Sequence, residues 1–201
     1  MTGVRRLPEL VGRLPRTRAA LEFAERQHAG QRRSSDGAPF IEHPLEVGWL
    51  LYRAGAPDDV IAAGILHDVL EKTEVSAAEL NARFGSRITE LVRAVTEDPT
   101  ITGYRHRKAA LRQQVAVAGP EALMVFAADK LSKVRELRAA ISNPGRDLER
   151  AVPPRRVAHL RACLGMLEER LGDSPLVGML ATKLAALNDD LKPSATTRAA
   201  A

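Results

Sequence analysis

The spacing of hydrophobic residues along the chain predicts helices almost throughout. Within residues 16–27, for example, Ala20, Phe23 and Ala24 recur at helical spacing. No segment alternates hydrophobic and polar residues for more than a few positions, so we expect an all-α fold. The longer predicted helices cover residues 16–27, 44–54, 58–72, 105–118, 121–140, 155–171 and 176–191.

Glycine, proline and capping residues predict where these helices begin and end. Residues 31–40 are polar and contain glycine and proline, which indicates a loop. Ser76 followed by Glu79 forms a capping box that opens a short helix. The helix predicted over residues 58–72 has a wide hydrophobic face, which indicates a central position. A turn is expected at residues 143–145.

Length and composition are typical of one compact domain. The chain has 201 residues, 45% hydrophobic and 27% charged. We expect an N-terminal extension over residues 1–13, a core over 14–141, further helices over 142–191 and a frayed tail over 192–201. The C-terminal helices either cover the core or form the contact of a homodimer, and the sequence does not separate these alternatives.

Charge, cysteine content and aromatic content exclude several classes of function. The formal net charge of +5 suits an anionic small molecule better than nucleic acid, and aromatic residues are only 3%. The single cysteine, Cys163, excludes a disulfide framework and a cysteine-rich zinc module. No apolar stretch approaches the roughly 20 residues of a membrane helix, so we expect a cytoplasmic protein without a membrane partner.

Four metal-ligand residues stand next to or inside hydrophobic segments: His43, His67, Asp68 and Asp129. An ionised carboxylate among apolar residues needs a cation or strong hydrogen-bond donors. Imidazole and carboxylate ligands together suit Mn²⁺, Fe²⁺, Zn²⁺ or Mg²⁺. Glu71 follows His67 by four residues, on the same face of the predicted helix. Each residue taken singly also fits a capping, packing or salt-bridge role.

Three segments, in this order, resemble a known family. Residues 24–44 read AERQHAGQRRSSDGAPFIEHP, residues 63–73 read AGILHDVLEKT, and residues 126–137 read FAADKLSKVREL. They resemble the HD-domain hydrolases of the RelA/SpoT family, especially the small stand-alone members similar to the metazoan SpoT homologue. The resemblance covers roughly residues 14–137.

The resemblance implies an HD-domain helical bundle that holds one divalent cation, usually Mn²⁺. It implies that His43, His67, Asp68 and Asp129 are the metal ligands. Members of this family remove the 3′-pyrophosphate from (p)ppGpp, which gives GDP or GTP and pyrophosphate. Some single-domain relatives act on NADPH instead.

The resemblance also implies roles for residues around the metal. Glu71 is placed to orient or deprotonate the attacking water. Arg33 matches a loop arginine that contacts the nucleotide base. Arg107 and Lys108 match a basic pair that can face phosphates, although a solvated helix face fits them equally well.

Two positions depart from the family pattern. Where this chain has Glu71-Lys72 the family usually has Glu-Asp, and where it has Lys133 the family usually has asparagine. Both changes add a cation where phosphate is expected. Lys72 could donate a proton if its pKa is lowered, and Lys133 could bind an anionic group. Both lysines could also point to solvent.

These departures leave rival interpretations beside (p)ppGpp hydrolysis. One keeps the metal and changes the substrate to NADPH, another nucleotide or a sugar phosphate. The other is a metal-containing nucleotide sensor without catalytic activity.

Overall fold

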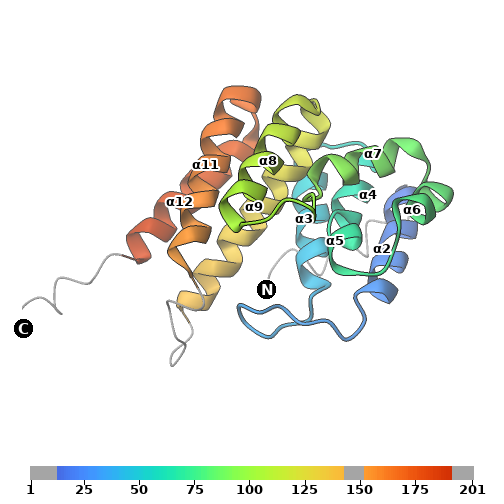
Figure 1. Cartoon of the computed structure of the whole chain (residues 1–201), viewed down its shortest axis with the longest axis horizontal. Helices are drawn as coiled ribbons and strands as arrows, with labels where there is room; N and C mark the ends of the chain where they lie inside the picture. Colours follow the sequence, from blue (N-terminus) through green and yellow to red (C-terminus); the bar gives the residue numbers. More distant parts are fainter. Residues whose placement is uncertain (1–12, 143–151, 192–201) are drawn as a thin grey trace, which may run out of the picture.

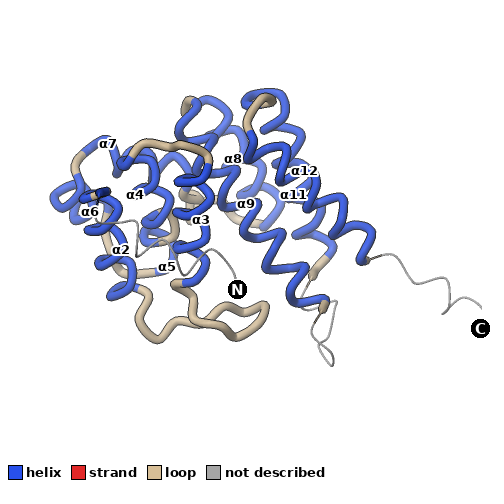
Figure 2. Tube along the Cα trace, turned by 180° about the vertical axis from the view of Figure 1, so that it is seen from behind, coloured by secondary structure: helices blue, strands red, loops and turns tan. Residues whose placement is uncertain are grey.

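The described part of the chain is helical, as predicted. The computed structural model describes residues 13–142 and 152–191, and Figure 2 shows helices joined by loops over these ranges. Within them, β-type pairing is limited to one isolated bridge between Arg32 and Pro39. The prediction of an all-α fold is therefore confirmed.

Most predicted helices begin and end within two residues of the observed bounds. The side chain of Ser76 accepts a hydrogen bond from the amide of Glu79 at 3.1 Å, as the capping box predicts. The observed helices are α2 (Pro15–Gln27), α3 (Glu42–Arg53), α4 (Asp58–Leu66), α5 (Val69–Lys72), α6 (Ala77–Phe84), α7 (Ser86–Val95), α8 (Tyr104–Val117), α9 (Pro120–Ile141), α11 (Pro154–Leu171) and α12 (Pro175–Asp190).

The single helix predicted over residues 58–72 is wrong, because α4 ends at Leu66 and α5 begins at Val69. His67 and Asp68 lie in the turn between them. The Nδ1 atom of His67 donates to the carbonyl of Gly64 at 2.7 Å. In a continuous helix that carbonyl would accept the amide of Asp68, so the imidazole competes with the helix at this point.

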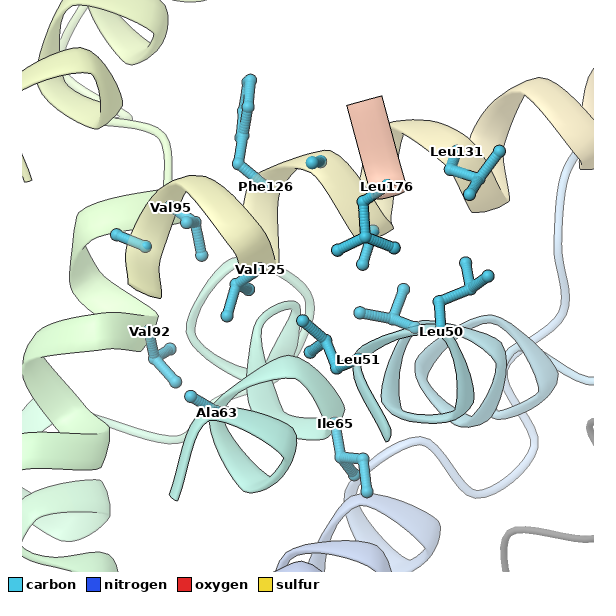
Figure 3. Close-up of a cluster of buried hydrophobic side chains, with 14 of the residues drawn as sticks. Leu50, Leu51, Ala63, Ile65, Val92, Val95, Val125, Phe126, Leu131 and Leu176 are labelled. Atoms are coloured by element: carbon cyan, nitrogen blue, oxygen red, sulfur yellow. The ribbon is translucent and has the colours of Figure 1, made fainter. Parts of the chain in front are cut away.

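Helix α4 lies at the centre of the fold, as its hydrophobic face predicted. It packs against α2, α3, α7 and α9, and every residue from Val60 to Leu66 is buried. Figure 3 shows the core between these helices, where Leu51 points toward Val125 and Ala63 points toward Val92. Gly64 allows close contact with α3, because a Cβ atom there would lie 2.2 Å from Leu51 Cδ1.

Helices α11 and α12 form a second layer on the long helix α9. Both pack on α9, and α11 also contacts α8, so these helices lie together at one end of the molecule in Figure 1. No described helix is both long and apolar enough to cross a membrane. The predicted turn at residues 143–145, the tail at 192–201 and nearly all of the N-terminal extension lie outside the described residues.

Candidate active site

The four predicted metal ligands come together from three separate segments. His43 lies in the first turn of α3, His67 and Asp68 in the turn between α4 and α5, and Asp129 in the middle of α9. The Nε2 atoms of His43 and His67 are 3.1 Å apart. Asp129 Oδ1 lies 3.2 Å from His43 Nε2 and 3.6 Å from His67 Nε2. All four residues are buried.

The geometry of this cluster fits a bound cation. One nitrogen of His43, one of His67 and one oxygen of Asp129 lie within 4.8 Å of one another. Asp68 Oδ2 is 3.4 Å from His67 Nε2 and 3.6 Å from His43 Nε2. This buried oxygen has no hydrogen-bond partner among the described residues. A buried carboxylate oxygen without a donor is costly, and a metal ion would compensate that cost.

The proton positions on His67 point to the same conclusion. A backbone carbonyl only accepts hydrogen bonds, so His67 Nδ1 must carry the proton that it donates to Gly64. The Nε2 atom of a neutral His67 therefore presents a lone pair to His43 and Asp129. A nitrogen lone pair that faces an imidazole nitrogen and a carboxylate oxygen forms a ligand set for a divalent ion.

Burial and charge shift the pKa values of the two histidines in opposite directions. Burial, and then the positive charge of Lys133, lower the pKa of His43 to about 4. Burial also opposes the charged form of His67, but the negative charge of Asp68 and a hydrogen bond to Asp129 outweigh it, and the pKa of His67 is raised. At neutral pH, His43 is therefore a neutral imidazole that can bind a metal.

Both carboxyl groups of the cluster stay ionised. Burial raises the pKa of Asp68, but the neighbouring His67 outweighs burial and lowers this pKa to about 2. Burial also raises the pKa of Asp129, but the positive charge of the adjacent Lys130 outweighs burial, and this pKa lies well below its usual value. Lys130 Nζ is 2.5 Å from Asp129 Oδ2. Two buried negative charges thus remain close together, with one buried ammonium beside them.

Three members of the cluster, His67, Asp68 and Asp129, line a pocket with a volume of about 830 Å³, whereas His43 is fully buried beside them. Glu71 and Lys72 of α5 line this pocket and are exposed, with 3.2 Å between Lys72 Nζ and Glu71 Oε1. Burial lowers the pKa of Lys72, but the charges of Asp68 and Glu71 outweigh burial and the pKa is raised. Lys72 therefore stays protonated, and the lowered pKa considered for a proton donor is wrong.

The predicted loop arginine also lines the pocket. Arg33 forms a bidentate ion pair with Asp36 and lies 3.2 Å from Glu42. The same loop is tied to α9 by a hydrogen bond from Ser35 to the buried carboxylate of Glu136. These contacts hold the guanidinium of Arg33 at the edge of the pocket.

Lys133 reaches the pocket from α9, and its ammonium pairs with Glu136 at 3.3 Å. The ammonium groups of Lys72 and Lys133 each lie 5.8 Å from the ring centre of Phe40. Both lysines therefore line the pocket, and each is also partly exposed to solvent.

Arg107 and Lys108 line the pocket from α8. Arg107 Nε lies 2.6 Å from Glu97 Oε2, and Lys108 forms an ion pair with the other oxygen of the same carboxylate. Burial raises the pKa of Glu97, but its hydrogen bond with Lys108 outweighs burial and lowers the pKa. Two cations thus share one carboxylate, and the group keeps a net positive charge.

Several pocket residues were not identified from the sequence. His159 of α11 is buried and lines the pocket, whereas His106 of α8 is exposed and does not line it. The sequence contained one indication for Glu136. It follows Asp129 by seven residues, two helical turns, and so lies on the same face of α9. The other unidentified lining residues include Tyr104, Lys130, Arg156 and Leu160.

Comparison with protein families matches residues 20–153 to the HD domain. A relative from Homo sapiens, guanosine-3′,5′-bis(diphosphate) 3′-pyrophosphohydrolase MESH1, is 36% identical over 121 residues, which cover 59% of this chain and 67% of the human protein. A guanosine-3′,5′-bis(diphosphate) 3′-pyrophosphohydrolase from Aquifex aeolicus is 35% identical over 121 residues, which cover 59% of this chain and 17% of that protein.

Solved structures share the fold. One, described as a metazoan ortholog of SpoT that hydrolyzes ppGpp, has a TM-score of 0.72 at 24% identity and covers 88% of this chain and 97% of its own. A protein from Listeria monocytogenes EGD-e has a TM-score of 0.65 at 27% identity, with 73% of this chain and 99% of its own covered.

The family and the geometry agree. An HD domain implies a divalent metal, and the buried His43, His67 and Asp129 provide a matching ligand cluster. The HD model matches more than half of the residues, and the human relative is similar over two thirds of its length. The chain is therefore a member of the HD-domain family.

Proposed function

We propose that this protein is a metal-dependent phosphohydrolase that removes the 3′-pyrophosphate from (p)ppGpp. Water attacks the phosphorus atom bonded to the 3′ oxygen, and the bond from that phosphorus to the 3′ oxygen breaks. The 3′ oxygen takes up a proton, which leaves GDP or GTP and pyrophosphate. The observation that carries this proposal is the convergence of His43, His67, Asp68 and Asp129 beside a pocket lined with cations.

The proposed metal ligands are His43, His67, Asp68 and Asp129, and the proposed ion is Mn²⁺. Nitrogen and carboxylate ligands also accept Fe²⁺, Zn²⁺ and Mg²⁺. When bound, a divalent cation lowers the pKa of a water molecule and so makes a nucleophile available near neutral pH. The unpartnered Asp68 Oδ2 supports a ligand role for Asp68 as well as for the three residues of the tighter cluster.

Glu71 is the proposed general base. Its carboxylate lines the same pocket as His67 and Asp68, and it is solvent-exposed, so it can exchange protons with water. Lys72 pairs with this carboxylate and remains charged, which suits stabilisation of negative charge on the transferred phosphoryl group. In this proposal Glu71 moves the proton and Lys72 contributes only its charge.

The substrate-binding proposal assigns Arg33, Arg107, Lys108 and Lys133, which all line the pocket, to the substrate. Lys133 lies beside the metal ligands, close enough for its charge to act on His43 and Asp68. Arg33 projects from the loop that is fixed by Asp36. Arg107 and Lys108 enter from α8 and suit a second phosphate group.

A second candidate function is hydrolysis of a different phosphorylated compound, such as NADPH, another nucleotide or a sugar phosphate. Lys72 and Lys133 favour it, because both reach the pocket and both depart from the family pattern. Two added cations change which anionic group is held best beside the metal ligands.

The test is incubation of the purified protein with Mn²⁺ and a panel of phosphorylated compounds, with separate detection of phosphate and pyrophosphate. Release of pyrophosphate from (p)ppGpp by the wild type, and its absence in His67→Ala, is the expected result. Release of phosphate from another member of the panel would transfer the assignment to the second candidate. Binding without turnover on every compound would identify a nucleotide sensor instead.

A further inference from the structure

A continuous row of hydrogen bonds leads from His43 away from the pocket. His43 Nδ1 lies 2.9 Å from the hydroxyl of Ser132, and that hydroxyl lies 2.8 Å from Glu46 Oε2. The other oxygen of Glu46 accepts a hydrogen bond from Arg135 Nη1 at 3.0 Å. Glu46 lies on α3, three residues after His43, whereas Ser132 and Arg135 lie on α9. The row therefore joins the two helices behind the metal ligands.

The proton positions in this row follow from the chemistry of its members. Arg135 can only donate, and an ionised Glu46 can only accept. The single hydroxyl proton of Ser132 must therefore point to Glu46. The oxygen of Ser132 is then left to accept, so the proton of a neutral His43 must sit on Nδ1. If that proton sat on Nε2, either the contact to His43 or the contact to Glu46 would contain no hydrogen.

We propose that Ser132 and Glu46 are positioning residues for the metal, which hold His43 in the tautomer that turns the Nε2 lone pair toward the ligand cluster. This inference rests on the metal site of the proposed function. The negative charge of Glu46, relayed through the hydroxyl, also makes the imidazole a stronger ligand. Ser132 is 1% exposed and His43 is 0% exposed, so water does not compete for these hydrogen bonds.

The two histidines are supported in different ways. His67 donates its Nδ1 proton to the neutral backbone carbonyl of Gly64, which no side-chain substitution removes. His43 instead depends on a side-chain hydroxyl with a carboxylate behind it. His67 therefore provides an internal control for any measurement on His43.

The first experiment measures the dissociation constant for Mn²⁺ alone, in the absence of substrate. Ser132→Ala is expected to weaken Mn²⁺ binding by roughly 10–100-fold, the range for loss of an outer-shell partner. Ser132→Thr keeps the hydroxyl and is expected to bind close to wild type. Glu46→Gln is expected to lie between them, because its amide oxygen still accepts from Ser132 without carrying charge. Glu121→Gln removes the negative charge from a similar Arg–Glu pair, with Arg87 at 2.7 Å, outside the pocket, and is the matched control.

The second experiment observes the imidazole nitrogens of the metal-free protein by ¹⁵N NMR. We expect the His43 proton on Nδ1 in the wild type and Ser132→Thr, and a mixture of tautomers in Ser132→Ala. His67 should be unchanged in every variant. A wild-type His43 that carries its proton on Nε2 would overturn the proposal, as would wild-type Mn²⁺ affinity in Ser132→Ala. Neither readout uses a nucleotide, so a wrong substrate assignment would leave both results intact.

Discussion

At the scale of single residues, Glu71 occupies a position suited to proton transfer. Glu71 lines the same pocket as the buried Asp68, yet the Glu71 side chain is 36% exposed to solvent. We predict that Glu71→Gln retains the fold and the metal but lowers turnover by roughly 10²–10⁴-fold, the range for loss of a general acid or base. Steady-state kinetics together with metal analysis checks this prediction.

The control is Glu74→Gln, because Glu74 is exposed, lies three residues from Glu71 and does not line the pocket. This variant should have the wild-type rate. Equal rates for both variants would remove Glu71 from the mechanism.

Lys72 and Lys133 lead to a prediction about substrate preference. Each has a carboxylate partner, Glu71 or Glu136, and each lies 5.8 Å from the Phe40 ring. We predict that Lys72→Asp combined with Lys133→Asn, which restores the family pattern, raises pyrophosphate release from (p)ppGpp about tenfold, or about 1.4 kcal/mol in the barrier. The reason is that the double change frees the proposed base Glu71 from its ion pair with Lys72, and this gain outweighs the loss of a positive charge near the phosphoryl group.

The measurement is pyrophosphate release by the double variant at saturating Mn²⁺, compared with wild type. Lys183→Asn, on α12 outside the pocket, is the matched control and should have no effect. A double variant that folds and binds metal but is no faster on (p)ppGpp would show that the lysines do not limit this reaction.

The sequence identified the proposed metal ligands better than the residues that support them. His67 and Asp68 are adjacent in a recognisable motif, and Asp129 stands out as a charge in an apolar segment. Ser132 carries no such signal, because an exposed serine and a buried one look alike in a sequence. Its role depends on the neighbouring α3, which brings Glu46 within 2.8 Å.

At the scale of helices, the contact between α3 and α4 determines where the two histidines meet. A Cβ atom on Gly64 would lie 2.2 Å from Leu51 Cδ1 and 3.3 Å from Val47 Cγ1, both buried. We predict that Gly64→Ala lowers the free energy of unfolding by about 1–3 kcal/mol through overpacking. It should also weaken Mn²⁺ binding, because His67 follows Gly64 by one turn while His43 lies on α3.

Denaturant unfolding and a Mn²⁺ titration check this prediction. Gly165→Ala is the control: it lies inside α11, and an added Cβ there would meet no atom within 4 Å apart from the backbone of its own helix and its chain neighbours. That substitution should stabilise the protein by up to about 1 kcal/mol, since alanine favours helix over glycine. A Gly64→Ala variant as stable as wild type would mean that α3 and α4 can separate without cost.

Helix positions could be predicted from the sequence because hydrophobic residues recur at helical spacing within each helix. The break in the helix at His67 and Asp68 could not be predicted from the sequence. The neighbouring residues on both sides are strongly apolar, and the backbone dihedral angles of His67 and Asp68 remain in the right-handed helical region. What ends α4 is a hydrogen bond from the His67 ring to the carbonyl of Gly64. Such competition between a side chain and the backbone depends on the rotamer of the imidazole, which packing determines.

At the scale of the whole molecule, the pocket is completed by α11, which follows the segment of family resemblance. Arg156, His159 and Leu160 line it from this helix. Hydrophobic spacing predicted α11 but not which neighbour its faces contact, because that depends on how it crosses α8 and α9. The metal ligands were therefore predictable, and the part of the pocket that α11 lines was not.

His159 gives this packing a pH dependence. Burial, then the charges of Lys130 and Lys108, lower the pKa of His159 to about 3. Its Nδ1 lies 3.0 Å from Arg112 Nη1, and Cys163 Sγ is 3.5 Å from the ring nitrogens. Because the unfolded histidine titrates near 6.5, the unfolded state binds more protons below that pH. The contribution of His159 is therefore complete above pH 6.5 and is lost as the pH falls toward 3.

We predict that His159→Gln loses less stability than wild type between pH 7 and about pH 5, since it removes this proton uptake. Urea unfolding at several pH values in the metal-free protein measures the difference. His106→Gln, on the exposed side of α8, should keep the wild-type pH dependence. Parallel curves for wild type and His159→Gln would show that this histidine is not held in its neutral form.

A metal ion bound to the ligand cluster would also cross-link the chain. The members of the cluster come from α3, from the α4–α5 turn and from α9, so one bound ion would tie together three segments that are distant in the sequence. We predict that Mn²⁺ at a hundred times its dissociation constant adds about 2.7 kcal/mol to the free energy of unfolding, and that His67→Ala abolishes the gain. Thermal unfolding with and without Mn²⁺ measures it, and an equal gain in His67→Ala would place the ion elsewhere. Copies made during metal shortage would then unfold more often and be degraded sooner, so the amount of this protein in a cell would follow the metal supply.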